Sequence, residues 1–161
     1  MFNNIKKFVD KTMEYLCILI VLLMCILVTY QVITRYVFDQ PSSVSEILSR
    51  YLFIWLVLFG GAYVFGLREH MSISFLKQKL SNKVQIYLDM LSEFIIAIFT
   101  FTIMILGGYS ITLRQMLQMD SSLQLPVGII YSAIPIAGII MIFYFIYNET
   151  ILLKKLKELQ Q

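Results

Sequence analysis

Two acidic residues, Asp89 and Glu93, stand one helical turn apart just before a long apolar segment and are the strongest candidates for chemistry. A buried acidic pair in a membrane typically marks an ion or proton site. However, the apolar run over residues 94–111 is long enough to span the bilayer by itself. We therefore expect both acids to lie at the cytoplasmic rim, where Lys83 or Arg68 can neutralise them. The alternative is a self-sufficient small channel or proton-linked carrier that uses Asp89 and Glu93.

The rest of the sequence offers little for catalysis. A single histidine, His70, excludes a haem held by two imidazoles of one chain and a histidine-rich metal site. Cys17 and Cys25 both fall inside the first apolar run, so they form neither a CxxC redox pair nor a water-facing pair. No phosphate-binding loop, HExxH motif or nucleophile elbow is present. The sequence predicts a protein that is not an enzyme, with no cofactor and no metal.

Two polar pairs stand at the other ends of the first two apolar runs: Glu46 with Arg50, and Gln31 with Arg35, each spaced i,i+4. They can act in helix capping and snorkelling, or they can dock a partner or clamp two helices. At the inner end of the second run, the segment Arg68-Glu69-His70 either anchors the helix at the interface or makes a specific contact.

Small residues are concentrated in the last three apolar runs. In lipid, small residues let helix backbones approach closely, and this packing replaces the missing hydrophobic drive. Internal packing and docking on a larger membrane partner both remain open. The residues are Gly60, Gly61, Ala62, Gly66, Gly107, Gly108, Ala133, Ala137 and Gly138.

These residues are carried by four apolar runs. The chain is 59% hydrophobic and only 14% charged, whereas about a quarter of a soluble domain is charged. Spanning about 30 Å of hydrocarbon takes roughly 20 helical residues. Helix is the predicted state because backbone polar groups in lipid need partners within their own segment, and the alternating polarity of barrel strands is absent. The runs cover residues 16–33, 51–67, 94–111 and 127–147.

The sequence thus predicts an all-α membrane protein of one domain, residues 1–161. An amphipathic lead-in before the first helix either lies along the inner leaflet or continues into that helix. The stretch from Ser43 to Glu46 matches a capping box, which predicts a short interfacial helix beginning at Ser43 and bending into the second span. Ser81 can cap the third helix, and Pro126 suits the first turn of the fourth. Expected bounds are about 14–37, 43–50 (interfacial), 51–68, 82–111 and 126–149.

The thirteen Lys and Arg residues are distributed unevenly between the helix ends. Only Arg35, Arg50 and Arg114 flank one side of the predicted membrane. All the others precede the first helix, follow the fourth, or lie between the second and third. The positive-inside rule therefore predicts both termini and the central loop in the cytoplasm of a bacterial inner membrane. No basic stripe with interleaved aromatics exists, so we expect lipid and no nucleic acid as a partner.

Two blocks of residues resemble the small membrane subunit, the DctQ-like or Q subunit, of tripartite ATP-independent periplasmic (TRAP) transporters. The resemblance covers nearly the whole chain. The family often has two adjacent acids where this chain has Ser45-Glu46, which leaves the role of a second carboxylate open. The first block contains Arg35-Tyr36-Val37-Phe38, Pro41, Glu46, Arg50 to Trp55, Gly60-Gly61-Ala62 and Arg68-Glu69-His70, and the second contains Leu125-Pro126, Tyr131, Ile134-Pro135 and Gly138.

The resemblance implies a non-catalytic subunit that enlarges the stationary scaffold of a sodium-coupled secondary transporter. Its partners would be a large membrane (M-type) subunit, which carries the substrate and sodium sites, and a periplasmic substrate-binding protein. Typical substrates of the family are small organic acids such as C4-dicarboxylates or sialic acid. The residues expected at partner or bundle contacts are Arg35, Glu46, Arg50, Trp55, Gly60, Gly61, Ala62, Gly66, His70, Pro126, Tyr131, Pro135 and Gly138.

Overall fold

The computed structural model describes residues 2–68 and 81–158, except for the side chain of Asn82. Within these ranges it contains helices, turns and one isolated β-bridge. Four stretches are long and apolar enough to cross a membrane, so the predicted all-α membrane architecture is confirmed. The elements are α1 (Phe2–Tyr36), α2 (Ser43–Leu67), α4 (Asn82–Phe99), the π-helix η1 (Thr100–Gly107), α5 (Gly108–Gln115), α6 (Gly128–Tyr131) and α7 (Ala133–Glu158).

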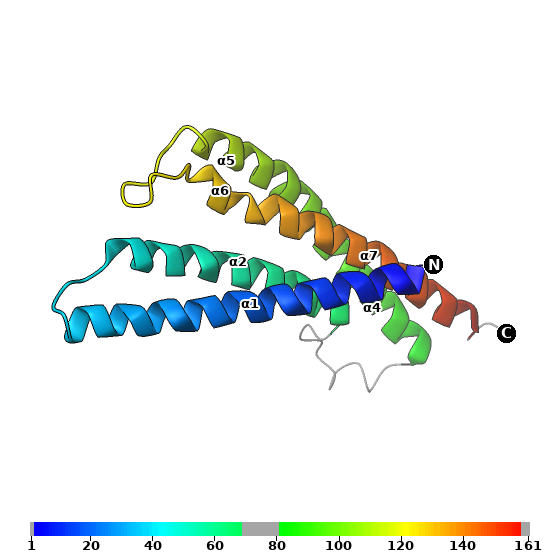
Figure 1. Ribbon diagram of the computed structural model, residues 1–161. Coiled ribbons are helices and arrows are strands. Elements are labelled where there is room, and N and C mark those ends of the chain that lie inside the picture. The colour runs from blue at the N-terminus through cyan, green and yellow to red at the C-terminus, as the bar shows by residue number, and fades with distance from the viewer. Residues whose placement is uncertain (1, 69–80, 159–161) are drawn as a thin grey trace.

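The helices form two halves that meet at one end of the bundle. Figure 1 shows α1 and α2 as an antiparallel pair, with α6 and α7 leading back alongside the continuous helix of α4, η1 and α5. α2 and α7 pack against each other and join the halves. The start of α1 and the end of α7 lie together at what we call the terminal end, and the halves spread apart toward the opposite end.

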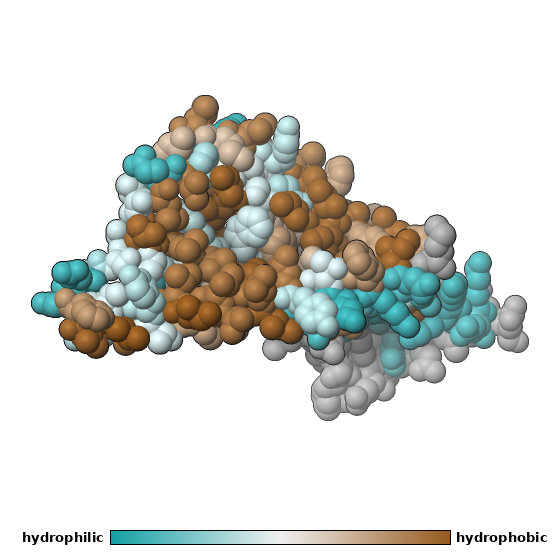
Figure 2. Space-filling model, in the orientation of Figure 1, coloured by the Kyte–Doolittle hydropathy of each residue, from teal (hydrophilic) through white to brown (hydrophobic). Residues whose placement is uncertain are grey.

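The buried core is small and lies where α1, α2 and α7 meet. Its fully packed members are Met13 and Ile20 of α1, Phe59 and Ala62 of α2, and Ala137 of α7. Most large apolar side chains instead face outward. Figure 2 shows them as a broad hydrophobic surface over the middle of the molecule, with hydrophilic residues toward both ends. Lipid is the solvent that suits such a surface.

α1 is continuous through the amphipathic lead-in, which decides between the two alternatives for that segment. Two contacts favour this continuation. Lys6 Nζ pairs with Asp10 Oδ2 at 2.6 Å, one turn along the helix, and Asp10 Oδ1 accepts a hydrogen bond from the Tyr144 hydroxyl of α7 at 2.9 Å.

The start of α2 corrects the predicted capping box. Ser42, and not Ser43, is the N-cap, because its hydroxyl accepts the backbone N–H of Ser45 at 3.4 Å. Glu46 does not reach back to the cap but pairs with Arg50 at 3.3 Å. The segment predicted as a separate interfacial helix forms the first turns of one continuous helix that ends at Leu67. Ser81 occupies the N-cap position of α4 without a side-chain capping bond.

The third span contains a π-helix that no sequence pattern predicted. Glu93 and Ala97 before it, and Thr100 at its first position, are buried at ordinary α-helical spacing. After it, Gly108 and Thr112 are buried, and from Thr100 onward the inward positions recur every four residues. The wider π turns carry one extra residue, and this keeps the inward face of the span turned toward α6 and α7.

The fourth span is interrupted near its start. α6 ends at Tyr131 and α7 begins at Ala133, because Pro135 has no N–H to donate to the carbonyl of Tyr131 and its ring crowds that turn. Pro126 was predicted in the first helical turn. It instead lies before α6, bridged to Met119, while the neighbouring Val127 N–H bonds the Gln118 carbonyl at 2.8 Å.

Candidate functional site

An ion-pair cluster closes the terminal end of the bundle. Arg68 directly follows α2, in the left-handed conformation (φ 59°) that ends this helix. Its Nη2 lies 3.1 Å from Glu93 Oε1 and 3.9 Å from Asp89 Oδ2. Glu93 is only 1% exposed. Of the two cations suggested by sequence, Arg68 is the partner of both acids, so it makes a specific contact beyond interfacial anchoring.

The left-handed conformation at Arg68 is unusual, since glycine or asparagine normally ends a helix in this way. A glycine here would relieve backbone strain but would provide no charge. Arg68 both terminates α2 and extends a guanidinium across to α4. His70, expected to close the second span, lies outside the described residues.

A second set of polar contacts ties α1 to α7 at the same end. The Tyr144 hydroxyl bonds Asp10, and the Tyr147 hydroxyl donates to Asn3 Oδ1 at 3.0 Å. Sequence reasoning missed these residues. The sequence contains only a weak indication of these contacts, namely two tyrosines one turn apart near the end of an apolar helix. The same pattern is typical of the aromatic belt at a membrane interface.

The small residues of α2 divide into two groups. Ala62 is fully buried. A Cβ added to Gly66 would lie 2.5 Å from Cε1 of Tyr144, so this glycine is required by the close approach of α7. In contrast, a Cβ on Gly60 or Gly61 would meet nothing within 4 Å. Ala62 and Gly66 therefore pack the bundle, while Gly60 and Gly61 lie on a face that the described chain leaves open.

The fourth span uses its small residues inside the bundle. A Cβ on Gly138 would lie 3.0 Å from Ile105 Cγ1 and 3.1 Å from Met104 Cβ, so α7 approaches the π-helix closely there. Ile134 and Pro135 meet Gly108, whose added Cβ would lie 2.8 Å from Ile134 Cγ2.

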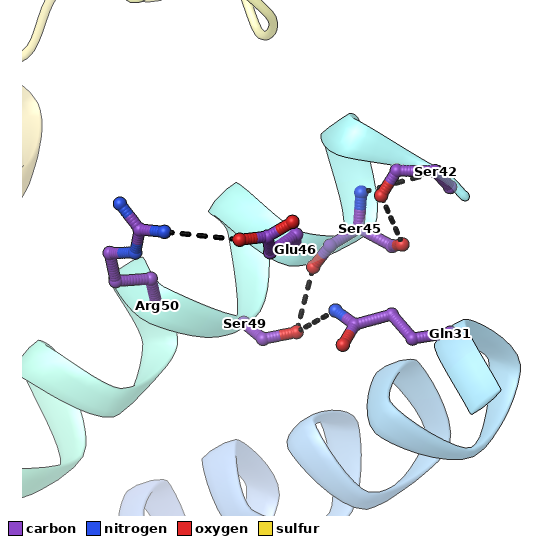
Figure 3. A network of polar contacts seen from close by, with 6 residues as sticks. All are labelled: Gln31, Ser42, Ser45, Glu46, Ser49 and Arg50. Atoms are coloured by element: carbon purple, nitrogen blue, oxygen red, sulfur yellow. Dashed lines mark hydrogen bonds and ion pairs between the residues drawn. The ribbon is translucent and has the colours of Figure 1, made fainter. Parts of the chain in front are cut away.

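At the opposite end, a chain of hydrogen bonds links α1 to the first turns of α2 (Figure 3). Gln31 Nε2 donates to Ser49 Oγ at 2.7 Å, and this hydroxyl donates to the Ser45 carbonyl at 2.7 Å. The predicted pairing of Gln31 with Arg35 is therefore wrong, because Gln31 points across to α2. Arg35 lies 5.9 Å from the Tyr36 ring centroid instead.

The ion pair between Glu46 and Arg50 points away from this chain of bonds in Figure 3. Both side chains are about two-thirds exposed, at 68% and 64%. Such a pair contributes little to stability by itself. It is nevertheless accessible to another protein or to a lipid headgroup. A docking role for this pair is therefore still one of the alternatives.

An apolar groove of about 480 Å³ separates α2 from α6. It brings together residues from both blocks of the resemblance, among them Arg50 and Tyr131, which are far apart in sequence. Trp55 does not line it and packs edge-on against Phe59, with ring centroids 5.3 Å apart.

Asp120 closes the loop between α5 and α6. Its carboxylate accepts hydrogen bonds from the Tyr51 hydroxyl of α2 and from the backbone N–H groups of Ser122 (2.9 Å) and Leu123 (3.0 Å). The bond from Tyr51 and, after it, the two backbone bonds hold the pKa of Asp120 below its usual range. Sequence reasoning missed this tether, since Asp120 and Tyr51 are distant in the chain.

Together these features define a multi-pass membrane protein whose charged groups gather at helix ends and whose helices present apolar faces. Among the described residues, no group of three His, Cys, Asp or Glu side chains could hold a metal ion. The class of protein is therefore a helical membrane protein with four candidate spans.

Comparison with known proteins identifies the family. Residues 24–153 match the model of the DctQ component of tripartite ATP-independent periplasmic transporters. The chain is 35% identical over 142 residues to a TRAP transporter small permease protein of Haemophilus influenzae, covering 88% of this chain and 87% of the relative. It is 25% identical to the sialic acid TRAP transporter small permease protein SiaQ of Vibrio cholerae, over 86% of this chain and 80% of the relative.

This chain belongs to the DctQ family and is a TRAP transporter small permease subunit. It also matches the sialic acid TRAP transporter permease protein SiaT of Haemophilus influenzae at 24% identity, where 90% of this chain corresponds to only 23% of the relative. In that relative the small permease sequence is part of a much longer permease chain.

Proposed function

We propose that this subunit is a non-catalytic scaffold that binds a large membrane subunit in the bacterial inner membrane, with both termini in the cytoplasm. A periplasmic binding protein delivers the substrate, and the large subunit carries the substrate and sodium sites. The substrate class is a small organic acid of the C4-dicarboxylate or sialic-acid kind, and two relatives with sialic acid in their names favour the latter.

The open face at Gly60 and Gly61 carries this proposal. In lipid a glycine adds no side-chain contact, but it lets the backbone of another helix approach closely. Within the described chain nothing occupies that space, and Phe53, Val57 and Val64 are exposed along the same helix. The long SiaT relative supports a large permease portion as the partner, because it joins both in one chain.

Complex assembly tests the proposal through a matched pair of variants. Gly61→Leu should leave the isolated subunit as stable as the wild type but reduce co-purification with the large subunit in mild detergent. Gly66→Leu should destabilise the subunit itself by about 1–3 kcal/mol, because the new side chain meets the Tyr144 ring. Thermal unfolding of the subunit and its recovery with the partner separate the two effects. Normal assembly and uptake with Gly61→Leu would refute the docking face.

The second candidate is a self-sufficient channel or proton-linked carrier that uses Asp89 and Glu93. Its motivation is the burial of Glu93. Both acids contact Arg68 at one end of the bundle, which favours a structural ion pair. Reconstitution of the chain alone in liposomes discriminates the candidates. Solute or proton flux that Glu93→Gln abolishes would favour the carrier.

A further inference from the structure

Several buried polar atoms of η1 and α7 have no hydrogen-bond partner among the described residues. Asn148 of α7 is 1% exposed, and neither atom of its amide is hydrogen-bonded. The same is true of Glu149 Oε1 and Thr100 Oγ1. Buried polar groups in proteins are nearly always satisfied, so each of these needs an explanation. The amide of Asn148 is the most informative of these groups, because it can both donate and accept hydrogen bonds and does neither within the described chain.

The register of the helices places Asn148 and Glu149 at the level of Glu93. α7 runs antiparallel to the third span, and Gly138 lies opposite Met104 and Ile105. Asn148 and Glu149 follow Gly138 by nearly as many residues as Glu93 precedes Met104. Asn148 shares the inward face of α7 with Tyr144 and Leu152, as Glu93 shares that of the third span with Ala97 and Thr100.

Among the residues that the structure describes, carboxylates outnumber cations around Glu93. The charged groups that face the cluster, within the described chain, are Arg68 after α2, Asp89 and Glu93 of α4, and Glu149 of α7. On α1, Asp10 is paired with Lys6 and Tyr144. Arg68 cannot fully neutralise both Glu93 and Glu149, and uncompensated buried charge is costly.

Protonation of one carboxyl removes the excess negative charge, and it requires fewer surrounding ligands than a bound metal ion would. The acids of the described residues do not converge in a group of three that could hold a metal. Two carboxyls in mutual electrostatic range instead favour a state in which one of them is neutral. A protonated carboxyl donates a hydrogen bond and an ionised one accepts, and the amide of Asn148 offers a partner to each form.

We propose that Glu93 and Glu149 form a coupled carboxyl pair that holds one proton at neutral pH, with the buried amide of Asn148 as its hydrogen-bonding group. Arg68 limits the pair to a single proton, since its charge favours the ionised form of the carboxyl that it contacts. The proposal assigns a proton-binding site to the terminal end of the bundle, which is the cytoplasmic end in the orientation proposed above, and it does not depend on which partner the subunit binds.

Infrared spectroscopy of the full chain in lipid nanodiscs tests this site. A protonated carboxyl has a carbonyl stretching band, distinct from that of a carboxylate, which shifts in deuterated water. We expect this band in the wild type at neutral pH. Glu93→Gln and Glu149→Gln should each remove it, because the remaining carboxyl then ionises beside Arg68. Arg68→Gln should strengthen it, since a second carboxyl then gains a proton.

Glu46→Gln is the matched control, since Glu46 is exposed at the opposite end, and it should leave the band unchanged. If Glu93→Gln does not fold, Glu149→Gln carries the same test at a less buried position. Absence of the band in the wild type, or its survival in both cluster variants, overturns the proposal. Loss of the wild-type band when sodium replaces choline in the buffer would also overturn it, by indicating a metal cation in place of the proton.

Discussion

At the scale of single residues, Arg68 combines two roles that different residue types usually fill. It adopts the left-handed conformation that ends α2, and it neutralises the buried Glu93. These roles conflict at the level of the backbone, where glycine would be better. The choice of arginine indicates that the ion pair matters more than the strain.

Replacement of Arg68 should separate the two roles. Arg68→Gln should destabilise the subunit by about 2 kcal/mol, because Glu93 is left buried without its cation. Arg68→Lys should retain part of this stability. Arg68→Gly should relieve the backbone and still be destabilised. Thermal unfolding of the purified subunit measures all three, and wild-type stability of Arg68→Gly would mean that helix termination is the main role.

Asp120 makes the loop between α5 and α6 sensitive to acid. Its pKa is lowered by the Tyr51 hydroxyl and the loop amides, so its folded state binds a proton less readily than its unfolded state. Its stabilising effect is therefore complete above the ordinary value of 3.8 and is lost as pH falls through the lowered value.

We expect Asp120→Asn to remove this part of the acid dependence of thermal unfolding. Tyr51→Phe, which deletes only the hydroxyl, should shift the same dependence toward higher pH. Identical acid profiles for the wild type and Asp120→Asn would show that the tether does not contribute.

At the scale of elements, the π-helix sets which side chains of the third span face inward. Because it contains one extra residue, deletion of one residue within it should restore a plain α-helix with both flanking faces unchanged. Deletion of Ile103, which is exposed within η1, should therefore leave the subunit folded.

Deletion of the equally exposed Ile95 is the matched control. It lies between Glu93 and Ala97 and would rotate Glu93 by about 100° relative to the rest of the span. That variant should lose thermal stability sharply. Equal stability of the two deletion variants would contradict a role for η1 in setting which side chains of the third span face inward.

At the scale of the whole molecule, the two ends of the bundle differ in their chemistry. At the terminal end, ion pairs and tyrosine hydroxyls join α1, α2, α4 and α7. At the opposite end, the halves spread apart and the groove between α2 and α6 stays open. A partner that fills this space would complete the packing that the chain leaves unfinished.

Topology reporters test which side of the membrane each end occupies. Alkaline phosphatase, which is active only in the periplasm, should be active when fused after Asp39 or Ser121. A fluorescent protein at the C-terminus should be fluorescent, because the lysines around the terminal end favour the cytoplasm. Phosphatase activity at the C-terminus would invert the proposed orientation.

The sequence alone determined the four apolar spans, because lipid leaves the backbone of an apolar run no alternative to helix. It also indicated that Arg68 could reach Asp89 and Glu93, which the ion pairs confirm, while their position at the rim of the membrane stays a prediction. These conclusions depend on length and local spacing, which a linear chain displays directly.

Only the tertiary structure decided which groups meet across the bundle. Gly61 and Gly66 look alike in sequence, yet one faces open space and the other faces the Tyr144 ring. The bond from Gln31 to Ser49 and the π-helix likewise depend on how neighbouring helices pack. The physical reason is that an apolar helix in lipid has no favoured face, so its rotation is set by contacts with other helices and not by its own pattern.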